Sequence, residues 1–400
     1  MPKTTERPVD SAEESTPLKA VPHRRKRKRV LRVFVRLLLV ALLGVSGFFI
    51  WKNWDTLSPE NVLVWINEQF AGGQKGDGFP VTTTGDTVVA MVPVNNNLTL
   101  LTDTSLLMYN TSGGEVVRRP HSFAQPLLKA AGDYVLVMES GGTRLSLEKR
   151  SATVLSHTVT EAIVTAAVAE NGYFAVVTGA SQSYVSQVAV YDKKGAEIYR
   201  WKSSEWMVAD VALQADGKAM AVVGISARDG NLQSALLTFK LDKSAEQPLC
   251  FSEQGLLLCA VSYLPSGGIA AVGDTAGWIL ASAEGQPVKY AYAERKLLGY
   301  AVGEAGLGLV LQAYGSSAGG ELIVLDSSGQ PQPAIPFASP YRDLCAYKDG
   351  FLLLTDRHLL AVNNNSLKGT LDIPPDGRLV AALGDKAIVL GLTTLNEYTF

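Results

Sequence analysis

Residues Ala169–Val177 read "AENGYFAVV", a glycine turn followed by a short apolar strand. Asn or Asp before Gly supplies the positive φ angle that a tight β-hairpin requires. Variants of this turn start at positions 130, 169, 214, 264, 303, 347 and 383, with spacings of 39, 45, 50, 39, 44 and 36 residues. A period of about 40–45 residues, built from four short strands, is typical of a β-propeller.

The repeats predict an all-β fold, an eight-bladed β-propeller over residues 79–400. Residues 87–119 read as a complete blade without the glycine of the first turn, whereas residues 378–400 offer only three strands. The missing strand can come from "FPVTTT" at residues 79–84, so that pairing of the N-terminal strand with the C-terminal blade closes the ring. Seven blades are the alternative, if the short unit at residues 341–375 is counted differently.

The N-terminal part of the chain is basic, and an apolar run follows it. Residues 1–36 hold eleven Lys or Arg and four Asp or Glu. Residues 37–400 hold twenty-five Lys or Arg and thirty-four Asp or Glu. Residues 30–54 are long enough for a transmembrane helix, which needs about 20 mostly apolar residues. The predicted organisation is a disordered basic cytoplasmic tail (1–29), a transmembrane signal-anchor helix (30–54), a short juxtamembrane helix with a linker (55–78) and the propeller (79–400).

The basic residues before the apolar run predict its orientation. Positive charge stays on the cytoplasmic side, so the N-terminus is expected in the cytoplasm and the propeller outside the bacterial cell membrane. The same charges would bind anionic lipid headgroups. A nuclear signal, a nucleic-acid arm and a cleaved signal peptide are weaker alternatives, because the acidic remainder repels phosphate backbones and the preceding basic region is too long for a signal peptide. The topology-determining residues are Arg24, Arg25, Lys26, Arg27, Lys28 and Arg29.

Two segments carry a resemblance to a known family, "GFPV" at Gly78–Val81 and "LTDTSLLMYNTSGGEV" at Leu101–Val116. With the basic tail and the span, they make residues 24–400 resemble a bacterial family of unassigned function. Its members have one N-terminal transmembrane anchor and an extracytoplasmic propeller of the pyrroloquinoline-quinone type. More distantly, the eight-bladed form is similar to quinoprotein dehydrogenases and to the propeller lipoprotein of outer-membrane assembly. The resemblance implies fold and location but no activity.

The sequence offers no motif for catalysis or metal binding. A quinone-dependent dehydrogenase would need adjacent cysteines, whereas Cys250, Cys259 and Cys345 are separate. Cys259 and Cys345 are interpreted as small buried side chains. No G-x-S-x-G, H-E-x-x-H or EF-hand pattern occurs. We therefore expect no enzyme activity, cofactor or metal. The alternative is an envelope enzyme, a glycan or peptide hydrolase or lyase, with an unrecognised site at the mouth of the propeller channel.

Binding remains the expected activity. Propeller blades surround a central channel, and residues near the start of the inner strands are candidates to line it. Three long connections, residues 179–187, 224–234 and 313–321, fall between second and third strands and should share one face. The sequence thus predicts an interaction, scaffold or sensing module that binds an envelope protein or glycan but no nucleic acid. Its weak binding candidates are Asp210, Tyr300, Arg342 and Asp343, with Trp206 and Trp278 as exposed aromatic side chains.

Overall fold

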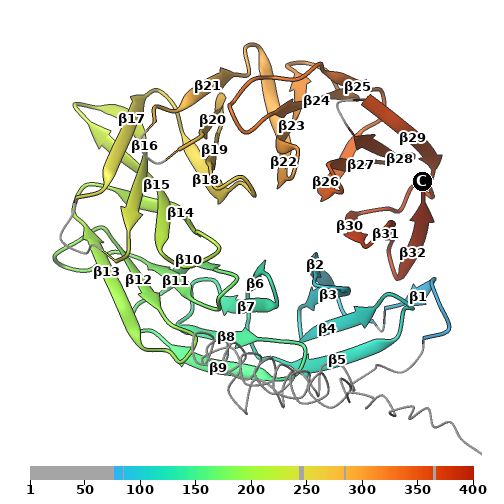
Figure 1. Ribbon diagram of the computed structural model, residues 1–400, viewed down its shortest axis with the longest axis horizontal. Helices are drawn as coiled ribbons and strands as arrows, with labels where there is room; N and C mark the ends of the chain where they lie inside the picture. The colour runs from blue at the N-terminus through green and yellow to red at the C-terminus, as the bar shows by residue number, and fades with distance from the viewer. Residues whose placement is uncertain (1–75, 84, 243–246, 283–284, 364–365) are drawn as a thin grey trace, which may run out of the picture. The chain divides into compact units, whose positions relative to one another are not determined.

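The computed structural model describes residues 76–400, except residue 84 and residues 243–246, 283–284 and 364–365. This part belongs to one compact unit, Phe70–Phe400. It forms thirty-two strands in eight four-stranded antiparallel sheets around a central opening (Figure 1). The predicted eight-bladed propeller is confirmed. The predicted transmembrane and juxtamembrane helices lie outside the described residues, and the described residues contain no helix that could cross a membrane.

Blades 1 to 7 run in chain order from an inner strand beside the opening to an outer strand, and blade 8 takes its outer strand from the N-terminal side. Blade 1 contains β2 (Val88–Val94), β3 (Asn97–Thr102), β4 (Ser105–Asn110) and β5 (Glu115–Pro120). Blade 2 contains β6 (Pro126–Ala131), β7 (Tyr134–Glu139), β8 (Arg144–Glu148) and β9 (Thr153–Thr158). Blade 3 contains β10 (Ile163–Val168), β11 (Phe174–Thr178), β12 (Ser186–Tyr191) and β13 (Glu197–Ser203). Blade 4 contains β14 (Met207–Leu213), β15 (Ala219–Arg228), β16 (Asn231–Lys240) and β17 (Leu249–Gln254).

The remaining blades follow the same order. Blade 5 contains β18 (Leu258–Tyr263), β19 (Ile269–Gly273), β20 (Ala276–Leu280) and β21 (Val288–Ala291). Blade 6 contains β22 (Arg295–Gly303), β23 (Gly306–Ala313), β24 (Gly320–Leu325) and β25 (Ile335–Phe337). Blade 7 contains β26 (Tyr341–Tyr347), β27 (Gly350–Thr355), β28 (His358–Asn363) and β29 (Ser366–Asp372). Blade 8 contains β30 (Leu379–Leu383), β31 (Lys386–Leu390), β32 (Thr394–Thr399) and β1 (Val81–Thr82).

Blade 8 combines the two ends of the described chain. In it, Val81 pairs with Leu395 and Thr82 pairs with Thr394. The amide of Thr83 extends the contact by donating to the carbonyl of Thr393 at 2.8 Å. The N-terminal strand therefore supplies the outer edge of the last sheet, which is the pairing that the strand count predicts.

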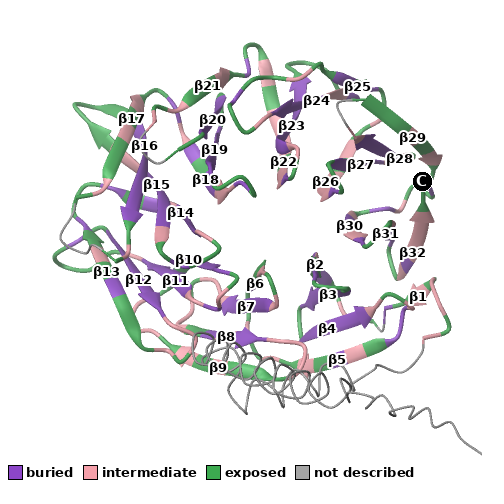
Figure 2. Cartoon of the chain, in the orientation of Figure 1, coloured by how far each residue is buried: buried purple, intermediate pink, exposed green. Residues whose placement is uncertain are grey.

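Buried apolar side chains gather in the seams, our term for the contact between two neighbouring blades. Eight clusters occur, each shared by two adjacent sheets. The second and third strands of the blades are almost wholly buried, whereas most outer strands alternate between exposed and covered residues (Figure 2). A strand covered on both faces reads as a continuous apolar run. This explains why strict polar alternation is confined to the periphery of the ring.

The inner strands share a β-bulge in six of the eight blades. A bulge adds one unpaired residue and redirects nearby side chains. Because the bulge recurs at the same distance from the hairpin that follows, the extra residues occupy equivalent positions around the channel. These extra residues are Val89, Val164, Ala209, Cys259, Leu298 and Arg342.

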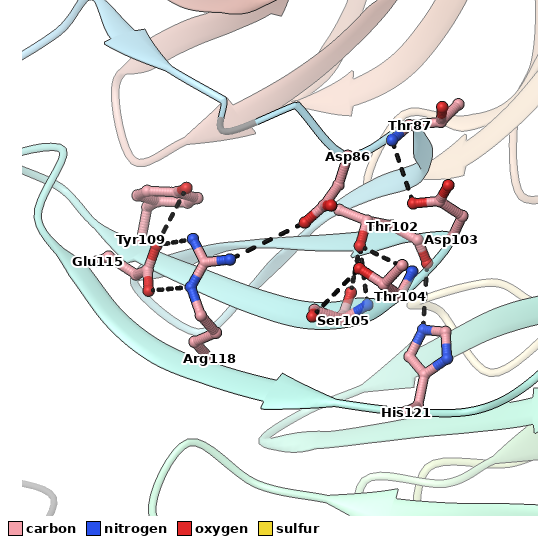
Figure 3. A network of polar contacts seen from close by, with 10 residues as sticks. All are labelled: Asp86, Thr87, Thr102, Asp103, Thr104, Ser105, Tyr109, Glu115, Arg118 and His121. Atoms are coloured by element: carbon pink, nitrogen blue, oxygen red, sulfur yellow. Dashed lines mark hydrogen bonds and ion pairs between the residues drawn. The ribbon is translucent and has the colours of Figure 1, made fainter.

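A buried threonine holds the turn between the second and third strands of blade 1 (Figure 3). Thr102 Oγ1 accepts from the amide of Ser105 at 2.8 Å and donates to its carbonyl at 3.0 Å. Blade 7 repeats the arrangement, with Thr355 and His358 at 2.9 and 3.0 Å. The segments "LLTDTSLL" and "LLTDRHLL" thus encode one turn at the same edge of two blades.

The aspartate at the same turn bonds to the next amide in two blades but not in a third. Asp103 Oδ1 accepts from the amide of Thr87 at 3.2 Å (Figure 3). In blade 5, Asp274 Oδ1 accepts from the amide of Leu257 at 3.0 Å. In blade 7 the residue opposite Asp356 is Pro340, which lacks an N–H group. Accordingly, Asp356 Oδ1 is buried without a partner among the described residues.

The seam between blades 2 and 3 contains a half-buried histidine. The ring of His157 on β9 lies 4.6 Å from the ring of Tyr191 and 6.0 Å from that of Phe174, centroid to centroid. Burial lowers the pKa of His157 below its usual value of 6.5. Its charged form is therefore disfavoured in the folded protein.

Substitution of Thr102 should destabilise the propeller. Thr102→Val leaves the amide and carbonyl of Ser105 without their side-chain partner, and one such loss costs about 1–3 kcal/mol. We expect a lower midpoint of urea unfolding. The matched control is Thr104→Val in the same turn, whose exposed hydroxyl contacts only the Ser105 hydroxyl, at 3.4 Å. Equal midpoints for the two variants would contradict the assignment.

The free energy of unfolding should depend on the protonation of His157. An unfolded histidine titrates at about 6.5, and the folded pKa lies lower, so the unfolded state binds more protons in this window. The stabilisation present above pH 6.5 should therefore decrease as the pH falls below it. His157→Phe should reduce this decrease between pH 7.5 and 5.5, measured by chemical denaturation. Val154→Ala on the same strand should retain the wild-type dependence, and a His157→Phe profile parallel to wild type would refute the prediction.

Candidate functional site

Five consecutive inner strands each contribute one polar side chain near the channel. We call these residues the channel cluster: Lys129 on β6, Thr165 on β10, Asp210 on β14, Cys259 on β18 and Tyr300 on β22. Blades 2 to 6 are thus all represented. Asp210 and Tyr300 were predicted from the sequence, whereas Lys129 and Thr165 were not. The available signal for Lys129 was a lysine inside the otherwise apolar strand "PLLKAA".

Asp210 is the centre of the channel cluster. Its side chain is buried, and Oδ1 lies 3.6 Å from Lys129 Nζ and 3.4 Å from Thr165 Oγ1. Oδ2 accepts from the amide of Val261 on blade 5 at 3.1 Å. Groups from blades 2, 3 and 5 therefore meet one carboxylate of blade 4. This convergence brings side chains together that are far apart in the sequence.

Cys259 and Tyr300 complete the cluster as protonated groups. Burial and the charges of Asp210 and Cys259 raise the pKa of Tyr300 to about 12. Burial, together with Asp274 and Asp210, also raises the pKa of the Cys259 thiol. A thiol with a raised pKa is a poor nucleophile at neutral pH. The cluster therefore offers hydrogen-bond donors and one ion pair rather than an activated nucleophile.

A cavity of about 710 Å³ lies where the same five inner strands end. Lys129 lines the cavity, together with small side chains such as Ala130 and Ala167. Glu170 and Glu304, in the turns between the first and second strands of their blades, line it as well. The volume is in the range of small-molecule pockets, about 300–1,000 Å³. Within the described residues, no group of three potential metal ligands occurs here or elsewhere.

Asp343 occupies in blade 7 the position that Asp210 occupies in blade 4. Its Oδ2 accepts from the amide of Val380 in blade 8 at 2.8 Å, and Oδ1 accepts from the amide of Leu344 at 2.9 Å. Burial raises the pKa of Asp343, although both backbone bonds act against this shift. Asp210 and Asp343 thus each join an inner strand to the next blade. The adjacent Arg342 is exposed.

The prediction that Trp206 and Trp278 are exposed is wrong. They are only 7% and 4% exposed. The Trp206 amide donates to Ser203 Oγ at 2.7 Å, and the side chain packs in the seam between blades 3 and 4. Trp278 is on the third strand of blade 5 and packs in the seam with blade 4. Both indoles are covered because the seams enclose these positions from a neighbouring blade.

The cysteine interpretation also needs correction. Cys259, the extra residue of a bulge, is exposed as a residue, although its thiol is partly buried and donates to the carbonyl of Val272 at 3.3 Å; Cys345 is half-buried. Cys250 lies on the outer strand β17 and is exposed as a residue. Partial burial of its thiol raises the thiol pKa. All three thiols are free.

The three long connections do join second and third strands, and therefore lie on one face of the ring. Residues 224–234, however, are an extended hairpin rather than a loop. Strands β15 and β16 continue to Arg228 and Asn231, and Asp229 and Gly230 form the turn with φ angles of 51° and 78°. Positive φ at both central residues is the geometry of a two-residue hairpin turn. The "DG" in the sequence is the signal for it.

This hairpin carries an apolar stripe. Met207 pairs with Ile225, and Ala227, two residues further along β15, pairs with Leu232. Opposite and alternate residues share one face of a sheet, so these four side chains form a row, which we call the hairpin stripe. Ile225 also pairs with Ser234, whose hydroxyl bonds to backbone groups of blade 5, so the stripe is on the side of blade 5. Met207 is 56% exposed and Leu232 is 45% exposed.

Comparison with solved structures supports the fold alone. BamB from Moraxella catarrhalis is 8% identical, with a TM-score of 0.51 over 80% of this chain and 100% of that one. The C-terminal WD40 domain of Sif2 is 11% identical, with a TM-score of 0.56 over 81% and 99%. Hsv2p from Kluyveromyces lactis is 12% identical, with a TM-score of 0.50 over 72% and 100%. Identities this low carry no residue roles.

No curated protein matches the sequence. Residues 75–370, about three quarters of the chain, match one protein family. The match begins just before β1 and ends within β29, so it contains most of the propeller and the whole channel cluster. The chain therefore belongs to the family of unknown function DUF5711.

Proposed function

We propose that this protein is a membrane-anchored interaction module on the outer side of a bacterial cell membrane, and that it binds an envelope protein through the blade-4 hairpin. The hairpin stripe carries this proposal. Met207, at the start of β14, and Leu232, on the part of the hairpin beyond the pairing with β17, both expose large parts of their apolar side chains. Apolar residues presented together on a surface mark a site of association.

The chemistry of the stripe favours a protein over a glycan. A glycan needs hydrogen-bonding side chains, whereas Met207, Ile225, Ala227 and Leu232 have none. An apolar row that ends at exposed polar residues of the hairpin turn, such as Asp229 and Asn231, resembles the core and rim of a protein interface. The alternative of a glycan hydrolase finds less support, because glycoside hydrolysis uses two carboxyl groups, whereas the channel cluster has one, Asp210, which already contacts Lys129 and the amide of Val261.

The proposed anchor rests on the sequence. Residues 30–54 have the length and apolar content of a span, and Arg24 to Arg29 precede it. This arrangement places the propeller outside the membrane, with the basic residues at the cytoplasmic headgroups. An acidic propeller outside also agrees with the expected absence of nucleic-acid binding.

The topology can be tested with reporters at the C-terminus. Alkaline phosphatase, which is active only outside the cytoplasm, should be active when fused after Phe400. Replacing the six basic residues Arg24–Arg29 with Ala should lower this activity, because the charge that retains the N-terminus is removed. Replacing Lys193 and Lys194 in the propeller with Ala is the control and should change nothing. An inactive phosphatase fusion together with an active cytoplasmic reporter would disprove the orientation.

The partner surface can be tested by proximity labelling from the C-terminus, followed by affinity measurements on the labelled protein. Met207→Glu with Leu232→Glu should weaken binding by about tenfold or more, because a charge would be buried at an apolar contact. The matched control is Leu367→Glu, a residue 49% exposed on the outer strand β29. Equal affinities for the two variants would exclude the hairpin stripe, and no reproducible envelope partner would argue against the module itself.

A further inference from the structure

Two arginines occupy equivalent positions in blades 7 and 8, Arg342 on the inner strand β26 and Arg378 immediately before the inner strand β30. These two strands are neighbours (Figure 1). Arg342 precedes Asp343, which pairs with Leu354. Arg378 precedes Leu379, which pairs with Leu390. Each arginine is five residues before the last paired residue of the inner strand in its blade. The two arginines are 36 residues apart, and so are the turns that follow them, which start at positions 347 and 383.

The two strands are close together at this level. The carboxylate of Asp343, next to Arg342, accepts from the amide of Val380, two residues after Arg378, at 2.8 Å. This bond joins blade 7 to blade 8 directly beside both arginines. The guanidinium groups therefore originate from adjacent strands at one height of the channel.

Neither guanidinium is neutralised by the protein. Both arginines are exposed, and neither side chain forms a hydrogen bond or ion pair with another described residue. Asp210 and Asp343 are the only acids in the described inner strands, and Lys129 and backbone amides already contact them. Asp376, close to Arg378 in the sequence, directs Oδ2 to the amide of Leu392 at 3.1 Å. Two like charges thus extend from adjacent blades, and neither forms an ion pair with Asp343 or with another described residue.

The equivalent positions in the two blades that flank blades 7 and 8 are aliphatic. Val89 holds the same position in blade 1, whose inner strand contacts that of blade 8, and it is 44% exposed. Leu298 holds it in blade 6, on the other side of blade 7. A ligand that reaches the two guanidinium groups would therefore place the rest of its body against aliphatic side chains.

We propose that Arg342 and Arg378 form an anion-binding site in the channel, which takes a phosphate or carboxylate group carried by a small ligand with an apolar body. A guanidinium group presents paired N–H donors in a fixed fork that matches these anions. Two such groups on adjacent strands would be relieved of their mutual repulsion by a bound anion. The site is on blades 7 and 8, and so does not depend on the hairpin stripe or on the anchor.

The test is titration calorimetry on the purified full chain with phenyl phosphate, benzoate, inorganic phosphate and benzyl alcohol. Phenyl phosphate or benzoate should bind saturably, and neutral benzyl alcohol should not. Arg342→Met and Arg378→Met should each weaken binding by about tenfold or more, since each removes a charge-assisted contact. Arg342→Lys should restore part of the loss, because it returns the charge without the fork. Arg228→Met, an exposed arginine at the tip of the blade-4 hairpin, is the control and should bind as wild type does.

Thermal unfolding provides a second readout that separates binding from folding. Phenyl phosphate should raise the melting temperature of the wild type but not that of the Arg342→Met/Arg378→Met double variant. Without ligand, the double variant should melt no lower than wild type, because it loses a repulsive pair.

Three results would overturn the proposal: no saturable binding of any anion, equal binding by the double variant, or an equal loss in Arg228→Met. A lower melting temperature of the ligand-free double variant would assign the arginines a structural role instead. If inorganic phosphate bound as tightly as phenyl phosphate, the proposal of an apolar body on the ligand would be wrong.

Discussion

Every blade of this protein has two apolar faces, and each face is covered only by the blade beside it. An open row of such sheets would leave two faces in water, so stability requires the row to close. The pairing of β1 with β32 meets this requirement because it combines both ends of the described chain in one sheet. The eight seams then share the burial, and no single central core exists.

The closed ring leaves its chemistry to the inner strands. Most of their residues are apolar, and the bulge that recurs in six blades places one extra residue at the same level of the channel. Polar side chains at or beside this level have two different uses. Asp210 and Asp343 join neighbouring blades through backbone amides, whereas Arg342 and Arg378 have no partner among the described residues. Adjacent residues thus have different roles. The carboxylate of Asp343 joins two blades, whereas the exposed guanidinium of Arg342 belongs to the proposed anion site.

The fold was predictable because the turn glycines and the period of the apolar runs are local signals that survive in every blade. The channel cluster was less predictable from the sequence. Asp210 and Tyr300 are recognisable as inner-strand residues, but their approach to Lys129 and Cys259 depends on the curvature of the ring, which joins residues more than 40 positions apart. Trp206 and Trp278 show the same limit, because an isolated apolar run does not reveal which side a neighbour will cover. Arg378 was overlooked although its offset from Arg342 equals that of the following turns.

The shortness of β1 has a mechanical consequence. Only Val81 and Thr82 pair with β32, although β32 continues to Thr399. Tension applied to the chain ahead of Gly76 passes through the contacts of Gly76 and Gly78 with Ser112 and then acts on this two-residue pairing. The β1–β32 pairing is therefore the next part of the propeller to experience a pull from the N-terminal side, after the contacts with Ser112 in blade 1. Strand β1 would separate from β32 while β30, β31 and β32 still pack against blades 1 and 7.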